Sequence, residues 1–265
     1  MTILYVGDIM AELGIATVDS CLPQLRAEYS IDCVIAQSEN VTDGRGITPS
    51  DMARLQAMGI DGFTGGNWSL YRSEIEPAMS DPLQPIIRPA NYPYGTPGLG
   101  YKYVATPHGK VLIISLLGHI VGRDADKPTD NPLQVIDTIL ESQKATKKIA
   151  TVVNFHGDFS SEKVIIGHYL DGRATVVVGD HWHVPTADAR VLPRGTAHMT
   201  DVGMCGALDA SLGVSFDSVV TRWRDGTQTR NIMETQGPKQ FNGLLVRVNT
   251  QTGLAISAEH IQRII

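Results

Sequence analysis

Short apolar runs alternate with amphipathic segments through the first 64 residues of the chain. The runs have the length of strands and end in glycine or polar residues, whereas the segments between them place apolar residues at helical spacing. At the second of these segments Thr48 is suited to cap a helix and Pro49 to fill its first position. The pattern predicts strands at residues 3–6, 31–36 and 61–64, and helices at residues 15–29 and 48–58.

Proline and glycine crowd residues 81–100, so we expect loops there, with at most one short strand at residues 86–87. Regular patterns resume afterwards, and Ser160 is placed to cap the helix that it begins. The predicted strands are residues 111–117, 149–155, 174–179, 230–233, 243–249 and 254–261, and the predicted helices are residues 132–144, 160–170 and 215–224. Because we find no internal repeat, low-complexity tract or linker, the sequence predicts one α/β domain over residues 1–265.

The composition excludes several classes of protein. With 42% hydrophobic and 19% charged residues, the chain fits neither a disordered nor a fibrous protein. Its 22 Lys and Arg against 28 Asp and Glu give a net charge of −6, which argues against a broad nucleic-acid surface but leaves a small or single-stranded phosphate ester open. No apolar run approaches the roughly 18–20 residues of a membrane span, and Asp8 interrupts the N-terminal apolar stretch. We therefore expect a cytoplasmic protein without a membrane segment.

The three cysteines, Cys21, Cys33 and Cys205, are widely spaced. Such spacing forms neither a disulfide framework nor a metal knuckle. The sequence predicts three buried thiols.

Polar residues suited to metal coordination follow several of the predicted strands. In α/β folds the carboxyl ends of strands are where ligand sites assemble, so residues far apart in sequence are expected to meet there. Carboxylate, amide and imidazole ligands together suit Mn, Fe or Zn better than Cu(I) or a cysteine-bound zinc. The candidate ligands are Asp8, Glu39, Asn40, Asn67, His156, His181 and His183.

Each of these residues also has a purely structural interpretation. Asp8 follows a glycine and Asn67 follows two, and both positions are typical of turns. A single histidine such as His156 is more often a hydrogen-bonded core residue. The pair His181 and His183 favours a metal more strongly, because residues i and i+2 of an extended segment point the same way and can face one centre.

The motifs that contain these residues resemble those of the calcineurin-like metallophosphoesterases, and within them the YmdB-like family. The motifs with candidate ligands are Val6-Gly7-Asp8, Ser38-Glu39-Asn40, Gly65-Gly66-Asn67, Asn154-Phe155-His156 and Gly179-Asp180-His181-Trp182-His183. Further matches extend over nearly the whole chain: Gly44-Arg45-Gly46-Ile47-Thr48, Arg88-Pro89-Ala90-Asn91-Tyr92-Pro93, Ser161-Glu162-Lys163, Tyr169-Leu170-Asp171-Gly172-Arg173, Thr186-Ala187-Asp188 and Thr200-Asp201-Val202-Gly203-Met204.

The resemblance implies a four-layer α-β-β-α sandwich with two divalent transition-metal ions, Fe, Mn or Zn, and 2′,3′-cyclic nucleotide phosphodiesterase activity. It also implies roles for the candidate ligands, with Glu39 bridging the two ions. Asp8, Asn40 and His183 would serve one ion, and Asn67, His156 and His181 the other. The substrate would be a small phosphate ester, a cyclic nucleotide or an RNA end; the sequence leaves a homo-oligomer open.

Two positions depart from the family pattern. Where the family has a histidine as general acid, this chain has Trp68, whose indole N–H does not titrate in the accessible range. The tryptophan could instead stack on a nucleobase. Asn154 stands where the family commonly has an aspartate that would orient a ligand. Nothing in the sequence indicates that His168 or His198 replaces the missing histidine.

Two functions therefore stay open at the level of the sequence. One is a di-metal phosphodiesterase with impaired protonation of the leaving group, in which the metals and the positioning of the ester still operate. The alternative is a metal-binding pseudoenzyme that recognises a nucleotide or an RNA end and acts as a regulator. Trp68 favours the alternative, and the complete set of candidate ligands favours the enzyme.

Overall fold

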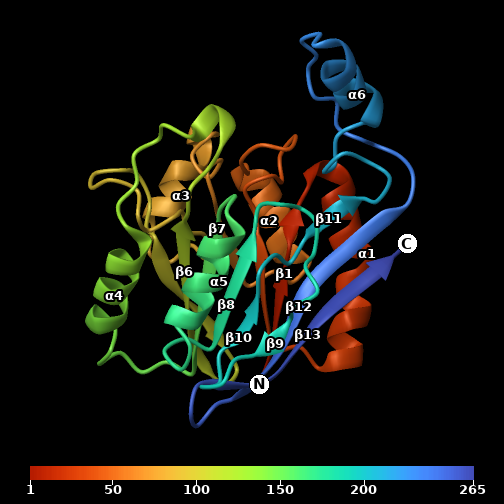
Figure 1. Cartoon of the computed structure of the whole chain (residues 1–265). Coiled ribbons are helices and arrows are strands. Elements are labelled where there is room, and N and C mark those ends of the chain that lie inside the picture. The colour runs from red at the N-terminus through yellow and green to blue at the C-terminus, as the bar shows by residue number, and fades with distance from the viewer.

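A computed structural model describes residues 1–265, apart from the side chain of Arg123. Two β-sheets pack face to face and helices cover their outer faces, which makes a four-layer α-β-β-α sandwich (Figure 1). The first sheet contains β1 (Thr2–Val6), β2 (Asp8–Ile9), β3 (Cys33–Gln37), β4 (Gly62–Thr64), β11 (Met204–Ala207), β12 (Lys239–Asn249) and β13 (Leu254–Ile264). Its order is β2-β11-β12-β1-β3-β4, with β13 paired to β12.

The second sheet has the order β5-β6-β7-β8-β10-β9. Its strands are β5 (Tyr101–Thr106), β6 (Gly109–Leu117), β7 (Ala150–His156), β8 (Val176–Asp180), β9 (Arg190–Val191) and β10 (Ala197–Met199). The α-helices are α1 (Ala11–Tyr29), α2 (Pro49–Ala57), α3 (Glu76–Ser80), α4 (Pro132–Ser142), α5 (Ser160–Tyr169) and α6 (Phe216–Asp225). Short 3₁₀ turns lie at Ser73–Ile75 and Gly122–Asp124. No α-helix among these is long and apolar enough to cross a bilayer.

Both faces of each central strand are buried, which explains the continuous apolar runs in the sequence. In β1, Ile3 and Tyr5 point between the sheets, while Leu4 and Val6 pack against α1 and α2. The outer face of the second sheet packs in the same way against α4 and α5. These continuous cores support our proposal that residues 1–265 form one domain.

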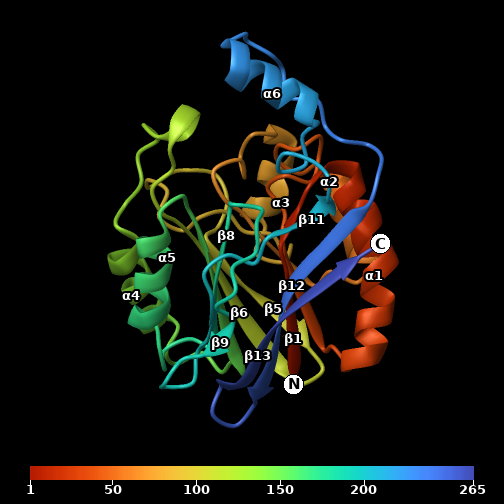
Figure 2. The ribbon, with the colours of Figure 1, turned by 45° about the vertical axis from the view of Figure 1, so that its right-hand side comes forward.

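Residues 208–238, called the arm below, connect β11 to β12 and contain α6. Figures 1 and 2 show α6 standing beyond the end of the sheets, above β11. The arm is attached through a small apolar cluster in which Val214, Val219 and Met233 pack against Met10 and Met204. The helix carries a large exposed side chain, Trp223, which is 87% exposed.

Most predicted elements are confirmed to within a few residues, and the helix that begins after Thr48 has the expected cap. The Thr48 hydroxyl accepts a hydrogen bond from the Asp51 backbone N–H at 3.2 Å, and Pro49 is the first helical residue. The three cysteines are free and buried, as predicted.

Two local predictions are wrong. Residues 230–233 form no strand: a single bridge joins Met233 to Val214, because this segment packs on the base of the arm and pairs with no sheet. Ser160 is already the first residue of α5, and the cap position is Phe159, whose side chain makes no capping hydrogen bond. Residues 86–87 form only an isolated bridge, from Ile86 to Phe63, in agreement with the expectation of loops and at most one short strand there.

Candidate metal centre

The candidate ligands gather at the carboxyl ends of the parallel strands of both sheets. In the first sheet β1, β3 and β4 run parallel, and in the second β6, β7 and β8 do. The carboxyl ends of parallel strands lie at one edge of a sheet. Residues from five separate segments of the chain therefore meet there, as the strand pattern predicted.

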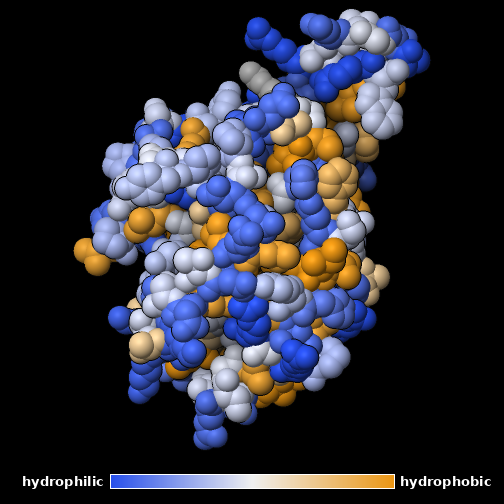
Figure 3. Space-filling model, turned by 60° about the vertical axis from the view of Figure 1, so that its left-hand side comes forward, coloured by the Kyte–Doolittle hydropathy of each residue, from blue (hydrophilic) through white to orange (hydrophobic). Residues whose placement is uncertain are grey.

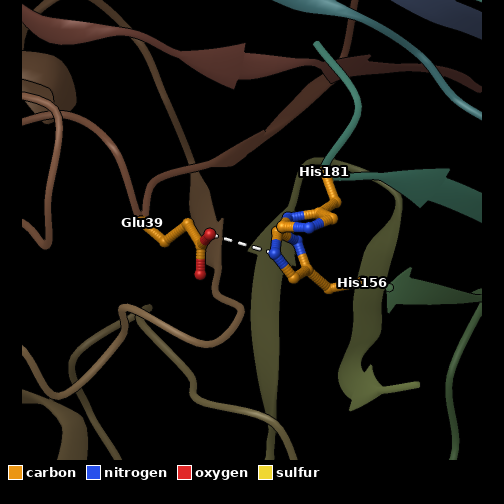
Figure 4. A group of neighbouring side chains, drawn as sticks. All are labelled: Glu39, His156 and His181. Atoms are coloured by element: carbon orange, nitrogen blue, oxygen red, sulfur yellow. Dashed lines mark ion pairs between the residues drawn. The ribbon is translucent and has the colours of Figure 1, made fainter. Parts of the chain in front are cut away.

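Glu39, Asn67, His156 and His181 form one group, part of which is drawn in Figure 4. His156 Nε2 lies 2.9 Å from Asn67 Oδ1 and 3.0 Å from Glu39 Oε1. The imidazole rings of His156 and His181 are 4.4 Å apart between centroids, and the Glu39 carboxylate points toward them (Figure 4). One ligand atom from each of Glu39, His156 and His181 lies within 4.8 Å of the others, so these three could hold a metal ion. We call Asn67, His156 and His181 the His156 side.

Asp8, Asn40 and His183 form a second group, called the His183 side. Asn40 Nδ2 donates to Asp8 Oδ1 at 3.1 Å and lies 3.2 Å from His183 Nε2. His183 Nε2 is 3.7 Å from Asp8 Oδ1. The backbone N–H of His181 donates to the other Asp8 oxygen at 3.2 Å, which links this group to the His156 side.

Buried charge shifts the pKa values of these residues. Burial raises the pKa of Asp8 to about 6, even though His183 opposes that change. Burial alone would also raise the pKa of Glu39, but His156 outweighs it and holds the pKa below the usual value. Burial alone would lower the pKa of His156, yet Glu39 and Asp180 raise it well above the usual value. Burial lowers the pKa of His181 to about 4, and the charge of His156 adds to that effect.

Two observations fit a bound cation. Glu39 Oε1 is buried, and its described polar contact is the ion pair with His156 Nε2 at 3.0 Å; no group donates a well-aligned hydrogen bond to it, although buried oxygens usually accept at least one. The other oxygen, Oε2, accepts a hydrogen bond from the Trp68 backbone N–H at 2.9 Å. Gly66 lies so close that a Cβ atom there would clash with both Glu39 and His156. The donor set suits a metal ion with nitrogen and oxygen ligands.

A buried carboxylate that sequence reasoning missed stands behind His156. Asp180 Oδ1 accepts a hydrogen bond from His156 Nδ1 at 2.6 Å. Its Oδ2 accepts from Tyr5 OH at 2.9 Å, from Gln37 Nε2 at 3.1 Å and from the Asn154 amide. Asp180 thus supplies the carboxylate that was expected to be lost at Asn154. Its position at the end of β8, directly before His181, was the available signal.

The segment that carries His181 and His183 is not extended, so that part of the sequence argument is wrong. Both residues have positive φ, 102° and 63°, and they point to different sides of the centre. Strand pairing of β8 ends at Asp180, because the chain turns there.

Asp201 holds this turn in place, together with Lys163 and Trp182. Asp201 Oδ2 accepts hydrogen bonds from the Trp182 backbone N–H at 3.0 Å and from Lys163 Nζ at 2.7 Å. Lys163 Nζ also lies 3.9 Å from the centre of a Trp182 ring. Lys163 and Asp201 are fully buried, so this ion pair fixes the loop between the two histidines from inside the fold.

A cleft of about 920 Å³ opens above the centre, between the body and the arm. Glu39, Asn40, His181 and His183 line its floor, and Trp68 lines its wall. The two other histidines considered from the sequence lie elsewhere: His168 is exposed on α5, and His198 is buried on β10 with Nδ1 2.9 Å from the Val177 carbonyl oxygen. Neither lines the cleft, so neither takes the place of the missing general acid there.

The sequence and the fold are similar to known proteins over their full length. The family model of YmdB-like proteins matches residues 4–263. The chain is 36% identical over 262 residues to a 2′,3′-cyclic-nucleotide 2′-phosphodiesterase of Bacillus subtilis, covering 98% of this chain and 96% of that protein. It is 28% identical to a putative phosphatase/phosphodiesterase of Mycoplasma pneumoniae, covering 98% of this chain and 92% of that protein.

Two solved structures share this architecture over nearly their full length. A hypothetical protein from Thermus thermophilus has a TM-score of 0.88 at 32% identity, with 100% of this chain and 99% of that chain covered. A structure described as a novel phosphatase from Mycoplasma pneumoniae has a TM-score of 0.90 at 27% identity, with 100% and 93% covered. With the family model matching almost every residue and this architecture shared, the chain belongs to the YmdB-like protein family.

Proposed function

We propose that this protein is a metal-dependent phosphodiesterase that hydrolyses 2′,3′-cyclic nucleotides or closely related phosphate esters. The observation that carries the proposal is the group of Glu39, His156 and His181, whose ligand atoms lie within 4.8 Å of one another. The name of the Bacillus subtilis relative supports the choice of substrate. Beyond Trp68, nothing in the structure or in the relatives favours a pseudoenzyme that only regulates, so we do not propose one. A cytoplasmic location stays a prediction from the sequence.

We further propose that two cations, Mn, Fe or Zn, bind at the centre. Glu39 would lie between them, with Asp8, Asn40 and His183 around one and Asn67, His156 and His181 around the other. When bound, such cations supply an activated water and neutralise the phosphate oxygens. Asp180 orients one of these ligands. It accepts the Nδ1 proton of His156, which leaves Nε2 turned toward Glu39 and Asn67.

In the proposed reaction the oxygen of water forms a bond to phosphorus and the bond from phosphorus to O2′ breaks. The leaving O2′ takes up a proton, and a 3′-phosphate remains. Trp68 lines the cleft at the position where the family has its acid, and its indole cannot give up a proton in this role. We therefore expect slow protonation of an alkoxide leaving group, whereas an aryl oxide leaves without a proton.

Metal analysis combined with a panel of phosphodiesters tests the proposal. The purified protein would be loaded with Mn, Fe or Zn, and metal per chain would be measured along with hydrolysis of adenosine 2′,3′-cyclic phosphate and bis(p-nitrophenyl) phosphate. Glu39→Gln should lose metal and both activities. The matched control is Glu12→Gln, which affects an exposed carboxylate paired with Arg54 and should change neither.

Two results would contradict the proposal. If the wild-type protein stays metal-free after loading, the proposed metal centre is wrong. A protein that binds metal yet cleaves no phosphodiester would favour the regulatory alternative.

A further inference from the structure

The cleft above the metal centre lies near the upper end of the usual size range for small-molecule sites. Pockets for small molecules usually measure about 300–1000 Å³, and this one has about 920 Å³. Its floor is the metal centre, and its far wall comes from the arm through Leu212, Val219, Arg222 and Arg230. Figure 3 shows the arm standing clear of the rest of the surface. The cleft therefore continues from the centre to a separate, projecting wall.

Positive charge collects in this cleft, although the protein as a whole has a net charge of −6. Arg45, Arg222 and Arg230 line it, and none of the three forms an ion pair with a described carboxylate. Arg222 donates to three neutral groups, the Thr229 hydroxyl and carbonyl oxygens, each at 3.2 Å, and Asn231 Oδ1 at 2.7 Å. Arg72 differs, because it is already paired with Asp43 at 3.0 Å. Guanidinium groups that lack a carboxylate partner are suited to bind phosphate.

Planar groups lie beside the metal centre in the same cleft. The Arg45 guanidinium lies 4.7 Å from the centre of the Trp68 ring, and Tyr71 meets Trp68 edge to face at 5.3 Å. Aromatic rings and guanidinium planes are the groups on which unpaired RNA bases stack. The cleft therefore offers a surface for a base next to the reacting phosphate.

A cyclic mononucleotide carries one phosphate, which the metal centre would hold. It has no second anion for Arg222 and Arg230 on the arm. A strand of RNA does, because every further nucleotide adds a phosphate.

We propose that the substrate is the 3′ end of a single-stranded RNA that carries a 2′,3′-cyclic phosphate. The cyclic phosphate lies at the metal centre, the terminal base contacts Arg45 and Trp68, and the preceding phosphates bind Arg222 and Arg230. This inference rests on the proposed function, since it places the same reaction at the end of a strand.

Comparing two substrates with the same terminal nucleoside tests the inference. They are adenosine 2′,3′-cyclic phosphate and a tetraadenylate that ends in a 2′,3′-cyclic phosphate. We expect kcat/KM to be at least about tenfold higher for the tetranucleotide at low salt. Each phosphate contact on a single strand adds about 0.7 to the slope of log K against log salt. Two contacts should therefore make the tetranucleotide slope steeper by about 1.4.

Two arginines of the arm provide a matched pair of variants. Arg230 lines the cleft, whereas Arg224 pairs with Asp225 and lines a different hollow, beside Phe216 and Trp223. Arg230→Ala should reduce the ratio of the two kcat/KM values about fivefold or more. Arg224→Ala should leave the ratio as in wild type. The inference would be overturned if the ratio of kcat/KM for the tetranucleotide to that for the mononucleotide were the same in both variants, or if it were near one in wild type. Either result would leave the proposed function intact.

A binding measurement separates this inference from failure of catalysis. Fluorescence anisotropy of the labelled tetranucleotide, with metal-loaded protein, needs no turnover. We expect Arg230→Ala to raise the Kd about fivefold and Arg224→Ala to leave it unchanged. Loss of hydrolysis of both substrates with this binding pattern intact would count against the proposed function alone. Unchanged binding in Arg230→Ala would overturn the RNA site.

Discussion

The two sides of the candidate metal centre are supported by different parts of the fold. On the His156 side, the imidazole donates to Asp180, which is fully buried and held by Tyr5, Gln37 and Asn154. On the His183 side, the imidazole Nδ1 faces the Leu212 carbonyl oxygen of the arm at 3.3 Å. One side is therefore backed by the core between the sheets and the other by a projecting segment.

This difference shows how one centre can combine rigidity with access. Groups locked by buried hydrogen bonds keep a ligand in one orientation. A segment attached through a small apolar cluster opens more easily than the core, and the arm also forms a wall of the cleft. We expect changes in the core to act on metal affinity at the His156 side, and changes in the arm to act on the His183 side and on the substrate.

The largest effect is expected where the two sides meet. Glu39→Ala removes the carboxylate proposed to lie between them, so both sides should lose metal. The value of kcat/KM should fall about 10³-fold or more, ~4 kcal/mol in the barrier. Metal content and steady-state kinetics on the same sample measure this, with circular dichroism to establish folding. Loss of one metal only, with activity retained, would show that the sides are independent.

Asp180→Asn tests the support from the core. The amide cannot hold the Nδ1 proton of His156 as the carboxylate does, so metal affinity at the His156 side should fall about 10- to 100-fold. Isothermal titration calorimetry with the metal measures binding at the His156 side and at the His183 side as separate steps. Asp171→Asn is the control, because Asp171 is also buried but holds the backbone of Arg194 and Thr196. Equal losses in the two variants would mean that the effect is one of general stability.

Trp68→His restores a group that can donate a proton next to the His156 side. Hydrolysis of adenosine 2′,3′-cyclic phosphate should rise about tenfold relative to bis(p-nitrophenyl) phosphate, less than the 10²- to 10⁴-fold of an established general acid. The ratio of the two rates is the measurement, because a change in metal occupancy would alter both. Trp68→Phe, which lacks a titrating group, should not raise the ratio. If both variants behave alike, another group supplies the proton.

The smallest effect is expected from loosening the arm. Val219 packs in the cluster with Met10 and Met204, whereas the adjacent Val220 is 52% exposed. Val219→Asp should weaken metal binding at the His183 side about fivefold, ~1 kcal/mol, and leave the step at the His156 side unchanged. Val220→Asp is the matched control and should bind metal as wild type does. An equal weakening of both sides by Val219→Asp would contradict the division between core and arm.

The sequence by itself determined the order of the main strands and helices and the set of polar residues at their ends. Apolar runs specify buried strands, and a threonine followed by proline specifies a helix start, because these signals act over a few residues. The helix at Pro49–Ala57 and the strand that ends at His156 follow directly from such patterns. The family motifs supplied the four-layer architecture, which period and spacing alone did not distinguish from other α/β folds.

Only the tertiary structure decided which groups support the centre. Asp180 meets Tyr5 across 175 residues of sequence, and no local pattern predicts that contact. The turn at His181 and His183 adopts positive φ because buried Asp201 and Lys163 hold it, against the extended form that the His-x-His spacing favoured. The segment at residues 230–233 has the composition of a strand but packs at the base of the arm, where Met233 forms a single bridge with Val214. Sequence patterns over a few residues determine local hydrogen bonds such as helix caps. Long-range packing determines which side chains hydrogen-bond to the candidate metal ligands and which segment forms the opposite wall of the cleft.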